Sequence, residues 1–392
     1  MTSLSNPSDA TVVTNGVAHK MFFLLRPRIL GAGLLFALSQ SAGATTFNLP
    51  NGADSLIDRS PGKPIYIKAT REDSLIDIAV QYLLGQEEIV RANKGVDRWY
   101  PKAGTEVLIP SSYLLPDAPR QGIVINLPEY RLYYYPPGSG KVISYSVGIG
   151  RVDWKTPLGV TKVVGKVKNP TWTPPATIRA EHLAKGDVLP EVWPAGPDNP
   201  LGLFAFRLGI PGYLLHSTNK PQGVGMQVSH GCMRLYPKDI EQMFPVVGVG
   251  TPVNIINQPV KVGWSNGLLY IESHPNLDGE ETSYQQRLDI ALNLIDRASN
   301  YQPVAVNGAA LRMALEESNG LPTVISGGDP TLATPPRPEN FSPNRPPLSP
   351  PVLTEPPAVE SEGVVPRSEI EKELRQEEMQ EREFKSSPFP RY

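Results

Sequence analysis

The placement of proline constrains this chain more than any other feature, because proline fixes φ and lacks the N–H donor that helices and central strands need. The 392 residues contain 43 prolines, about twice the average share. Fourteen of them follow Asp329. There they accompany the charged run RSEIEKELRQEEMQEREFK, a composition that buries too little apolar surface to fold alone. We therefore expect a disordered tail over 329–392, with a solitary helix at 367–385, behind a folded body.

The composition of the chain as a whole is that of a globular protein. Apolar residues make up 40% of the sequence, which is enough for a core, and the length allows two or three domains. The net charge of −2 gives no reason to expect nucleic acid as a partner. The sequence contains no internal repeat, no phosphate-binding glycine loop and no metal-ligand spacing among its five histidines.

The N-terminal region has the pattern of an export signal. Two arginines precede the apolar run 29–38, and small residues follow it up to Ala44. The run is shorter than the roughly 20 residues of a membrane span. We expect 1–44 to be a signal peptide that is cleaved, with an uncleaved anchor as the alternative. Residues 1–20 are polar and look like an extension, so Met21 is an alternative start.

Residues 64–110 have the pattern of a small separate unit. IYIK and TEVLIP predict two strands, and QEEIVRANKG predicts a short helix. A second helix is predicted by apolar residues at i, i+3, i+4 and i+7, namely Leu75, Ile78, Ala79 and Tyr82. Asp73 or Thr70 is expected to cap that helix, and Gly85 to end it.

The order of these elements resembles a known module. With DSLIDIA, IVRAN and VLIP in a strand–helix–helix–strand order, the unit resembles a LysM module. That family binds the N-acetylglucosamine-containing glycan of bacterial cell walls. The resemblance implies that 64–110 binds peptidoglycan, and an unrelated βααβ unit is the alternative.

A β-rich region follows. GIVINL and YRLYYYP flank Pro128-Glu129, which is a hairpin signal. Further short apolar runs are KVISYSVGIG, VTKVVGKV, LFAFRL, YLLH, QVSHGCMRL and PVNII. This spacing predicts a β-sandwich or barrel over 120–259. Residues 169–200 are rich in Pro, Gly and Trp, and we expect long functional loops there.

The body ends in an expected strand and helical extension over 260–328. One apolar helical face is formed by Leu288, Ala291, Leu292 and Ile295. Another is formed by Leu311, Ala314 and Leu315, with Asn307 as its cap and its end near Gly320. The fold class predicted for the whole body is therefore mainly β, with a small βααβ unit before the β domain and a short helical segment after it.

Cys232, in VSHGCMRLYP, is the only cysteine. Structural cysteines of exported proteins normally come in pairs. A lone cysteine is therefore either a small buried apolar residue or a thiol kept for its chemistry. Gly231 allows a sharp turn, so that the amides of Gly231 and Cys232 can face a developing oxyanion.

A nucleophilic thiol needs a base, and two histidines compete for this role. His230 is close in sequence, but an extended segment leaves it little freedom to approach the thiol. His216 ends the apolar strand YLL and begins a polar loop, a placement typical of active sites. The spacing slightly favours His216 and does not decide between the two.

The region around the thiol also resembles a known enzyme family. HSTNKPQGVGMQVSHGCMR, residues 216–234, resembles the signature of YkuD-type L,D-transpeptidases. TPLG, KNPTWTPPATIRAEH, LPEVWPAGPDNPLGLFAFRL and RLYPKDIEQMF look like the ErfK/YbiS branch of that family. The resemblance implies that Cys232 is the nucleophile and His216 the proton acceptor and donor. It also implies that the Gly231 and Cys232 amides form the oxyanion hole.

Other residues receive secondary roles from the same resemblance. Ser217 stands where many relatives have glycine, so either its hydroxyl or a backbone carbonyl orients His216. Arg234 either contacts a substrate carboxylate or forms a structural ion pair. Trp172 and Trp193 either line the peptide groove or are packing aromatics. Three positions match the signature and are interpreted as supports of the loop, namely Ser229, His230 and Arg234.

The implied reaction is peptidoglycan transpeptidation in the periplasm of a Gram-negative bacterium, without a metal or organic cofactor. A tetrapeptide stem would donate an acyl group to Cys232, and an amine of another stem or of an outer-membrane lipoprotein would accept it. An L,D-carboxypeptidase that uses water shares every residue. A sortase would place its cysteine after Thr-Leu-x-Thr, whereas this chain has Ser-His-Gly. In a non-catalytic wall-binding scaffold, decay should have erased Cys232 or His216.

Overall fold

The computed structural model describes residues 45–61 and 63–327. The expected signal peptide and the expected disordered tail, with its helix, lie outside the described residues. Within the described ranges, no helix is both long and apolar enough to cross a bilayer.

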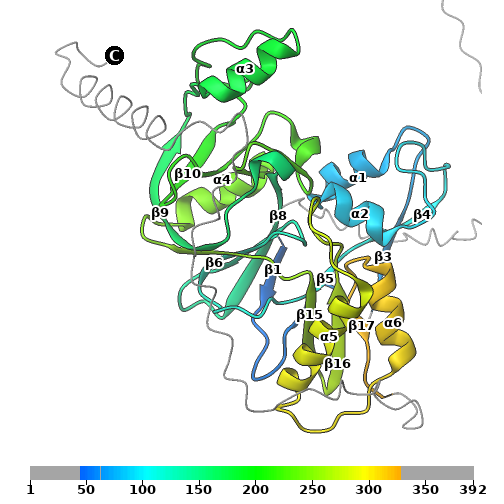
Figure 1. The fold of residues 1–392 in the computed structure, drawn as a ribbon. Helices are drawn as coiled ribbons and strands as arrows, with labels where there is room; N and C mark the ends of the chain where they lie inside the picture. Colours follow the sequence, from blue (N-terminus) through cyan, green and yellow to red (C-terminus); the bar gives the residue numbers. More distant parts are fainter. Residues whose placement is uncertain (1–44, 62, 328–392) are drawn as a thin grey trace, which may run out of the picture. The chain divides into compact units, whose positions relative to one another are not determined.

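One ten-stranded sheet forms the β domain (Figure 1). Its strands follow the order β1-β8-β13-β11-β10-β9-β14-β6-β7, and an additional β7–β8 pairing closes the path into a barrel-like ring, with β12 attached to β8. The predicted mainly-β fold class is therefore confirmed. The strands are β1 (Thr45–Asn48), β6 (Gly122–Asn126), β7 (Arg131–Tyr135), β8 (Lys141–Gly150), β9 (Gly159–Lys168), β10 (Phe204–Leu208), β11 (Leu214–His216), β12 (Gln227–Ser229), β13 (Met233–Leu235) and β14 (Pro252–Ile256).

The apolar runs of the sequence form the core of the β domain. The predicted hairpin is confirmed, because β6 and β7 pair antiparallel with Asn126 opposite Arg131. Helix α4 (Pro237–Val246), which the sequence analysis did not expect, adds Ile240 and Met243 to the same core. The core residues contributed by the strands include Ile123, Ile125, Leu132, Val147, Phe206, Leu215, Met233, Leu235, Val253 and Ile255.

The expectation of loops throughout 169–200 is wrong for part of that range. Helix α3 (Ala176–Ala184) lies within it, directly after Pro175. Among its residues only Ile178 is buried, so the sequence lacks the apolar stripe by which amphipathic helices are recognised. A 3₁₀ turn, η1 (Val152–Trp154), precedes this region, and α3 stands off from the barrel strands in Figure 1.

Residues 65–109 adopt the expected strand–helix–helix–strand order, with β3 (Ile65–Lys68) paired antiparallel to β4 (Glu106–Ile109). Between them lie α1 (Leu75–Tyr82) and α2 (Gln86–Ala92). We call this unit the N-terminal module. Its identification as LysM stays a prediction. Its core is formed by Ala69, Leu75, Ile78, Ala79, Leu84, Ile89, Val107 and Ile109.

The helix caps in the module differ from those expected. Ser74, which directly precedes α1, caps it by accepting a hydrogen bond from the Asp77 amide. Asp73 instead accepts a hydrogen bond from the Thr70 amide. Gly85 does not end α1 but stands at the N-cap position of α2. A cap must lie next to the first helical residue, and this local geometry favours Ser74.

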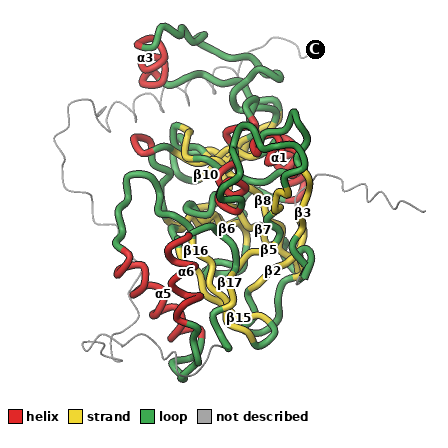
Figure 2. Tube along the Cα trace, turned by 90° about the vertical axis from the view of Figure 1, so that its right-hand side faces the viewer, coloured by secondary structure: helices red, strands yellow, loops and turns green. Residues whose placement is uncertain are grey.

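The C-terminal extension contains more strand than the sequence analysis expected. Strands β15 (Val260–Ser265), β16 (Leu268–Ser273) and β17 (Thr323–Val324) form an antiparallel sheet. Helices α5 (Tyr284–Ala298) and α6 (Gly308–Glu317) lie beside it in Figure 2. The predicted Asn307 cap is confirmed, because its side-chain oxygen accepts a hydrogen bond from the Ala310 amide at 3.0 Å. Two further strands, β2 (Leu56–Asp58) and β5 (Ser112–Leu114), pair antiparallel with each other.

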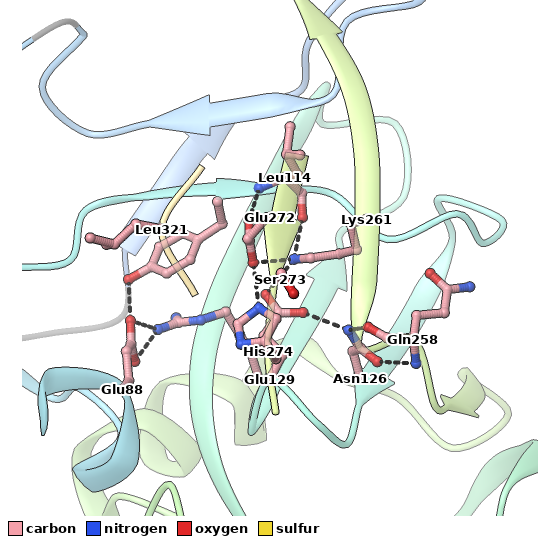
Figure 3. A network of polar contacts seen from close by, with 12 residues as sticks. Glu88, Leu114, Asn126, Glu129, Gln258, Lys261, Glu272, Ser273, His274 and Leu321 are labelled. Carbon is pink, nitrogen blue, oxygen red and sulfur yellow. Dashed lines mark hydrogen bonds and ion pairs between the residues drawn. The ribbon is translucent and has the colours of Figure 1, made fainter. Parts of the chain in front are cut away.

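A buried charge cluster joins the extension to the β domain (Figure 3). Lys261 Nζ lies 2.8 Å from a carboxylate oxygen of Glu129 and 2.6 Å from one of Glu272, and it donates to the Leu114 carbonyl at 2.6 Å. His274 Nε2 lies 2.7 Å from Glu272. Glu129, Glu272 and His274 approach one another closely enough to hold a metal ion. The Lys261 ammonium already supplies the positive charge that these carboxylates need.

Replacing Lys261 with methionine should destabilise the protein by about 3–5 kcal/mol, because two carboxylates would remain buried without their cation. Urea unfolding followed by circular dichroism measures this loss. The control is Arg297→Ala, which breaks a largely exposed ion pair with Asp117 and should cost at most about 1 kcal/mol. Similar losses in the two variants would contradict the assignment of Lys261 as a buried structural cation.

Candidate active site

The strand arrangement brings the predicted nucleophile and base to one face of the sheet. Strands β11 and β13 are parallel neighbours, and His216 pairs with Arg234. Cys232 directly precedes β13, two residues before Arg234. Paired residues and alternate residues of a strand share a face. Cys232, His216 and Arg234 therefore lie on one face, whereas Met233 is fully buried in the core on the other.

His216 is held as a neutral base. Its Nδ1 donates to the Ser217 carbonyl at 2.5 Å, so Nδ1 carries the proton and Nε2 keeps its lone pair. Burial, and next the positive charge of Arg234, lower the pKa of His216 to about 3. Of the two orienting groups that the sequence left open, the structure shows the backbone carbonyl.

Cys232 is a partly buried thiol whose Sγ contacts the Gly212 carbonyl at 3.5 Å. Burial raises the pKa of Cys232, while a backbone hydrogen bond at Leu214 and the charge of Arg234 oppose that rise. With the pKa of His216 lowered as well, the resting site holds a neutral thiol and a neutral imidazole at neutral pH.

The turn from Ser229 to Cys232 is stabilised by hydrogen bonds on both sides. Ser229 Oγ donates to the Cys232 carbonyl at 2.5 Å and accepts from the Gly231 amide at 3.2 Å. Gly231 has φ +99°, a conformation that favours glycine. Thr156 Oγ1 donates to the Gly231 carbonyl at 2.8 Å. In this conformation the Gly231 amide is bonded to Ser229, and its oxyanion role stays a prediction.

His230 faces helix α3. Its Nε2 lies 3.0 Å from a carboxylate oxygen of Glu181, and its ring packs edge-to-face on Trp154. Glu181 also pairs with Arg151 and Lys185, and these partners, Arg151 foremost, hold the pKa of Glu181 well below its usual value. Sequence reasoning missed Thr156, Arg151 and Glu181. Each is an ordinary polar residue far from the signature, and only the tertiary fold brings it to this turn.

Trp172 and Trp193 lie on either side of α3 in the chain, and they pair with each other. Their backbones exchange two hydrogen bonds, of 3.0 and 2.7 Å, in an isolated antiparallel bridge. Both residues are half-buried, and their contact with substrate stays a prediction. Arg234 forms no ion pair with any carboxylate of the described ranges, and its Nε is buried without a hydrogen-bond partner there.

A lone cysteine directly before one strand and a tautomer-fixed histidine on the neighbouring strand are the groups that an enzyme transferring acyl groups through a cysteine needs. The family model of the L,D-transpeptidase catalytic domain, YkuD, matches residues 120–255. The chain is 47% identical over 262 residues to "Probable L,D-transpeptidase YcfS" of Escherichia coli (strain K12), covering 66% of this chain and 81% of that protein.

A second relative matches over nearly its whole length. "Probable L,D-transpeptidase YbiS" of the same strain is 39% identical over 306 residues, which cover 77% of this chain and 99% of that protein. The solved catalytic domain of an E. faecium L,D-transpeptidase aligns with 36% of this chain and all of its own length, at 23% identity and a TM-score of 0.27. On the evidence of the sequence relatives, the chain belongs to the L,D-transpeptidase family and is an enzyme of that class.

Arg234→Gln should shift the titration of the site in a defined direction. Loss of the positive charge should raise the pKa of Cys232 further and let the pKa of His216 rise from about 3. Because Cys232 is the only cysteine, the pH profile of its alkylation by iodoacetamide measures the thiol directly. The midpoint should move to higher pH. The control is Arg207→Gln, which removes the same charge from an exposed position on β10 and should not change the midpoint pH of alkylation. An unchanged midpoint in Arg234→Gln would contradict the prediction.

Proposed function

We propose that the protein is a peptidoglycan L,D-transpeptidase in which Cys232 attacks the carbonyl of diaminopimelate, the third residue of a tetrapeptide stem. As the sulfur–carbon bond forms, His216 Nε2 takes the thiol proton. The tetrahedral intermediate then collapses and the carbon–nitrogen bond to the terminal D-alanine breaks. His216 returns the proton to the leaving amine, and a thioester on Cys232 remains.

The second half of the reaction regenerates the enzyme. An acceptor amine attacks the thioester and gives its proton to His216, and the thiolate that leaves takes that proton back. If the amine belongs to another stem, the product is a 3–3 crosslink. If it is a lysine of an outer-membrane lipoprotein, the product anchors the outer membrane to the wall. Neither half needs a metal or organic cofactor.

The observation that carries this proposal is the fixed tautomer of His216 beside β13, the strand that Cys232 directly precedes. The hydrogen bond from Nδ1 to the Ser217 carbonyl supports Nε2 as the basic nitrogen, and the β11–β13 pairing supports a shared face with Cys232. Arg234, which has no carboxylate partner in the described ranges, is placed to attract a substrate carboxylate. Such a group is present at the free end of a tetrapeptide stem.

Cys232→Ala should abolish release of D-alanine from a soluble tetrapeptide stem. His216→Gln should lower kcat by about 10²–10⁴-fold, the usual cost of losing a general acid–base group. Released D-alanine is measured with a coupled oxidase assay. Lys220→Gln, a change in the exposed part of the same loop, is the control and should keep wild-type turnover. Full turnover in Cys232→Ala would remove the thiol from the mechanism.

The products of the same reaction identify the acceptor. Mass spectrometry of reactions with a second stem, with a lysine-ended lipoprotein peptide and with neither shows which amine resolves the thioester. We expect a 3–3 dimer or a stem–lipoprotein conjugate. Tripeptide as the only product in every mixture would identify an L,D-carboxypeptidase that uses water.

We further propose that the enzyme acts in the periplasm, after removal of the N-terminal signal, and that the N-terminal module binds the glycan strands. The module exposes two adjacent aromatic side chains, Trp99 and Tyr100, which are 59% and 83% accessible. Exposed aromatic groups of this kind are costly to keep in water and often mark a binding surface.

Trp99→Ala/Tyr100→Ala should reduce pelleting of the protein with insoluble wall material while leaving D-alanine release from a soluble stem unchanged. The matched control is Tyr66→Ala, which removes an exposed aromatic from strand β3 of the same module. Unchanged pelleting of the double variant would exclude these two side chains as the glycan-binding surface.

A further inference from the structure

The loop that leads to the nucleophile is held by the N-terminal module. Val224 and Gly225 lie between His216 and Cys232, and their carbonyls accept hydrogen bonds from the amides of Gln86 and Glu87, at 3.1 and 3.2 Å. Those amides belong to the first turn of α2, where backbone N–H groups have no partner within the helix. The helix amides of the module and the carbonyls of the loop therefore satisfy each other's hydrogen bonding.

Two glycines allow this contact. Gly225 has φ +77°, and a Cβ added there would lie 2.2 Å from the Cα of Gly85 and 2.5 Å from the amide nitrogen of Gln86. The neighbouring atoms are backbone and cannot move aside as a flexible side chain would. The turn of the module and the loop of the β domain thus touch through bare backbone, which is the closest packing that two segments can reach.

The same turn of the module also contacts Tyr236 and strand β8. Tyr236, which follows β13, donates its hydroxyl hydrogen bond to the Leu84 carbonyl at 2.8 Å. Ser146, on β8, donates to the Leu83 carbonyl at 3.2 Å. The three consecutive residues Leu83, Leu84 and Gly85 therefore contact β8, Tyr236 directly after β13, and the loop between His216 and Cys232.

Glu88 of α2 takes part in a buried polar network (Figure 3). Glu88 pairs with Arg131 of β7, and the two side chains are only 13% and 5% exposed. The other contacts of the Glu88 carboxylate are with Tyr113 at 2.8 Å and with the amide of Gly85 at 3.0 Å. One side chain thus joins the barrel to the glycine that touches the loop.

We propose that residues 83–88 of the module are a positioning element of the active site. They support the loop at Val224 and Gly225, and β12 begins only two residues later and leads directly into the turn that carries Cys232. The module is then required for turnover even when the donor peptide carries no glycan. This inference rests on the proposed transpeptidase function, to which it adds a second role for the module beside wall binding.

The test compares Glu88→Gln with Glu106→Gln in the full chain. Glu106 is an exposed glutamate on β4 of the same module and serves as the charge-matched control. In Glu88→Gln, amides of residues 217–232 should exchange hydrogen faster, and kcat on a glycan-free tetrapeptide should fall about tenfold or more, as expected when reacting groups are slightly misplaced. The control should match wild type in both measurements.

A second variant avoids the removal of a buried charge. Ser146→Ala/Tyr236→Phe deletes the two hydrogen bonds to the turn and keeps the Glu88–Arg131 pair, so it serves if Glu88→Gln does not fold. Unchanged exchange in the folded variants, or faster exchange with unchanged kcat, would overturn the proposal. Absence of D-alanine release from wild type would instead count against the proposed function, while the exchange measurement would still report whether the module supports the loop.

Discussion

Strand β8 pairs with four other strands, β1, β7, β12 and β13, and so connects the barrel to the segments on either side of Cys232. The β8–β7 pairing closes the barrel. The pairings with β12 and β13 support the turn from Ser229 to Cys232, which lies between these two strands. Two glycines near the end of β8, Gly148 and Gly150, make room for the loop that leads into this turn because they lack side chains. A Cβ at Gly148 would lie 2.5 Å from the Gly223 carbonyl, and one at Gly150 would lie 2.9 Å from the Cα of Gly231. The loop can therefore lie directly against the strand, and Thr156 joins both by hydrogen bonds to Gly150 and Gly231.

The pKa shifts of Cys232 and His216 both favour the neutral form of the side chain. Burial raises the pKa of Cys232 and lowers the pKa of His216, and the carbonyl of Ser217 fixes the tautomer that leaves a basic nitrogen free. Arg234 is the charged group that most affects both. Arg234 has no carboxylate partner within the described residues, and its contact with a substrate carboxylate stays a prediction.

The three units of the described chain are joined by buried charges rather than by apolar surface alone. Glu88–Arg131 links the module to the barrel, and Lys261 links the barrel to the C-terminal extension through Glu129 and Glu272. Buried ion pairs contribute little net stability but penalise every arrangement that leaves one charge unpaired. They are therefore suited to fixing how units dock. In this protein the docking also sets the contact between the module and the loop from His216 to Cys232, where Gly85 meets Gly225.

The strands with continuous apolar runs and the apolar faces of α1, α5 and α6 could be predicted from the sequence, because periodicity is a local property of the chain. A short signature, which is equally local, singled out Cys232 and His216 as the candidate nucleophile and base. The sequence did not reveal α3, whose only buried residue is Ile178, or the roles of Thr156 and Glu181, which are distant in sequence from the turn they support. Three contacts became visible only in the tertiary structure. The Ser217 carbonyl orients His216, His230 faces Glu181, and Gly85 meets Gly225. Those contacts join residues far apart in the chain or depend on side-chain direction, and both are fixed when the strands pair and the units dock.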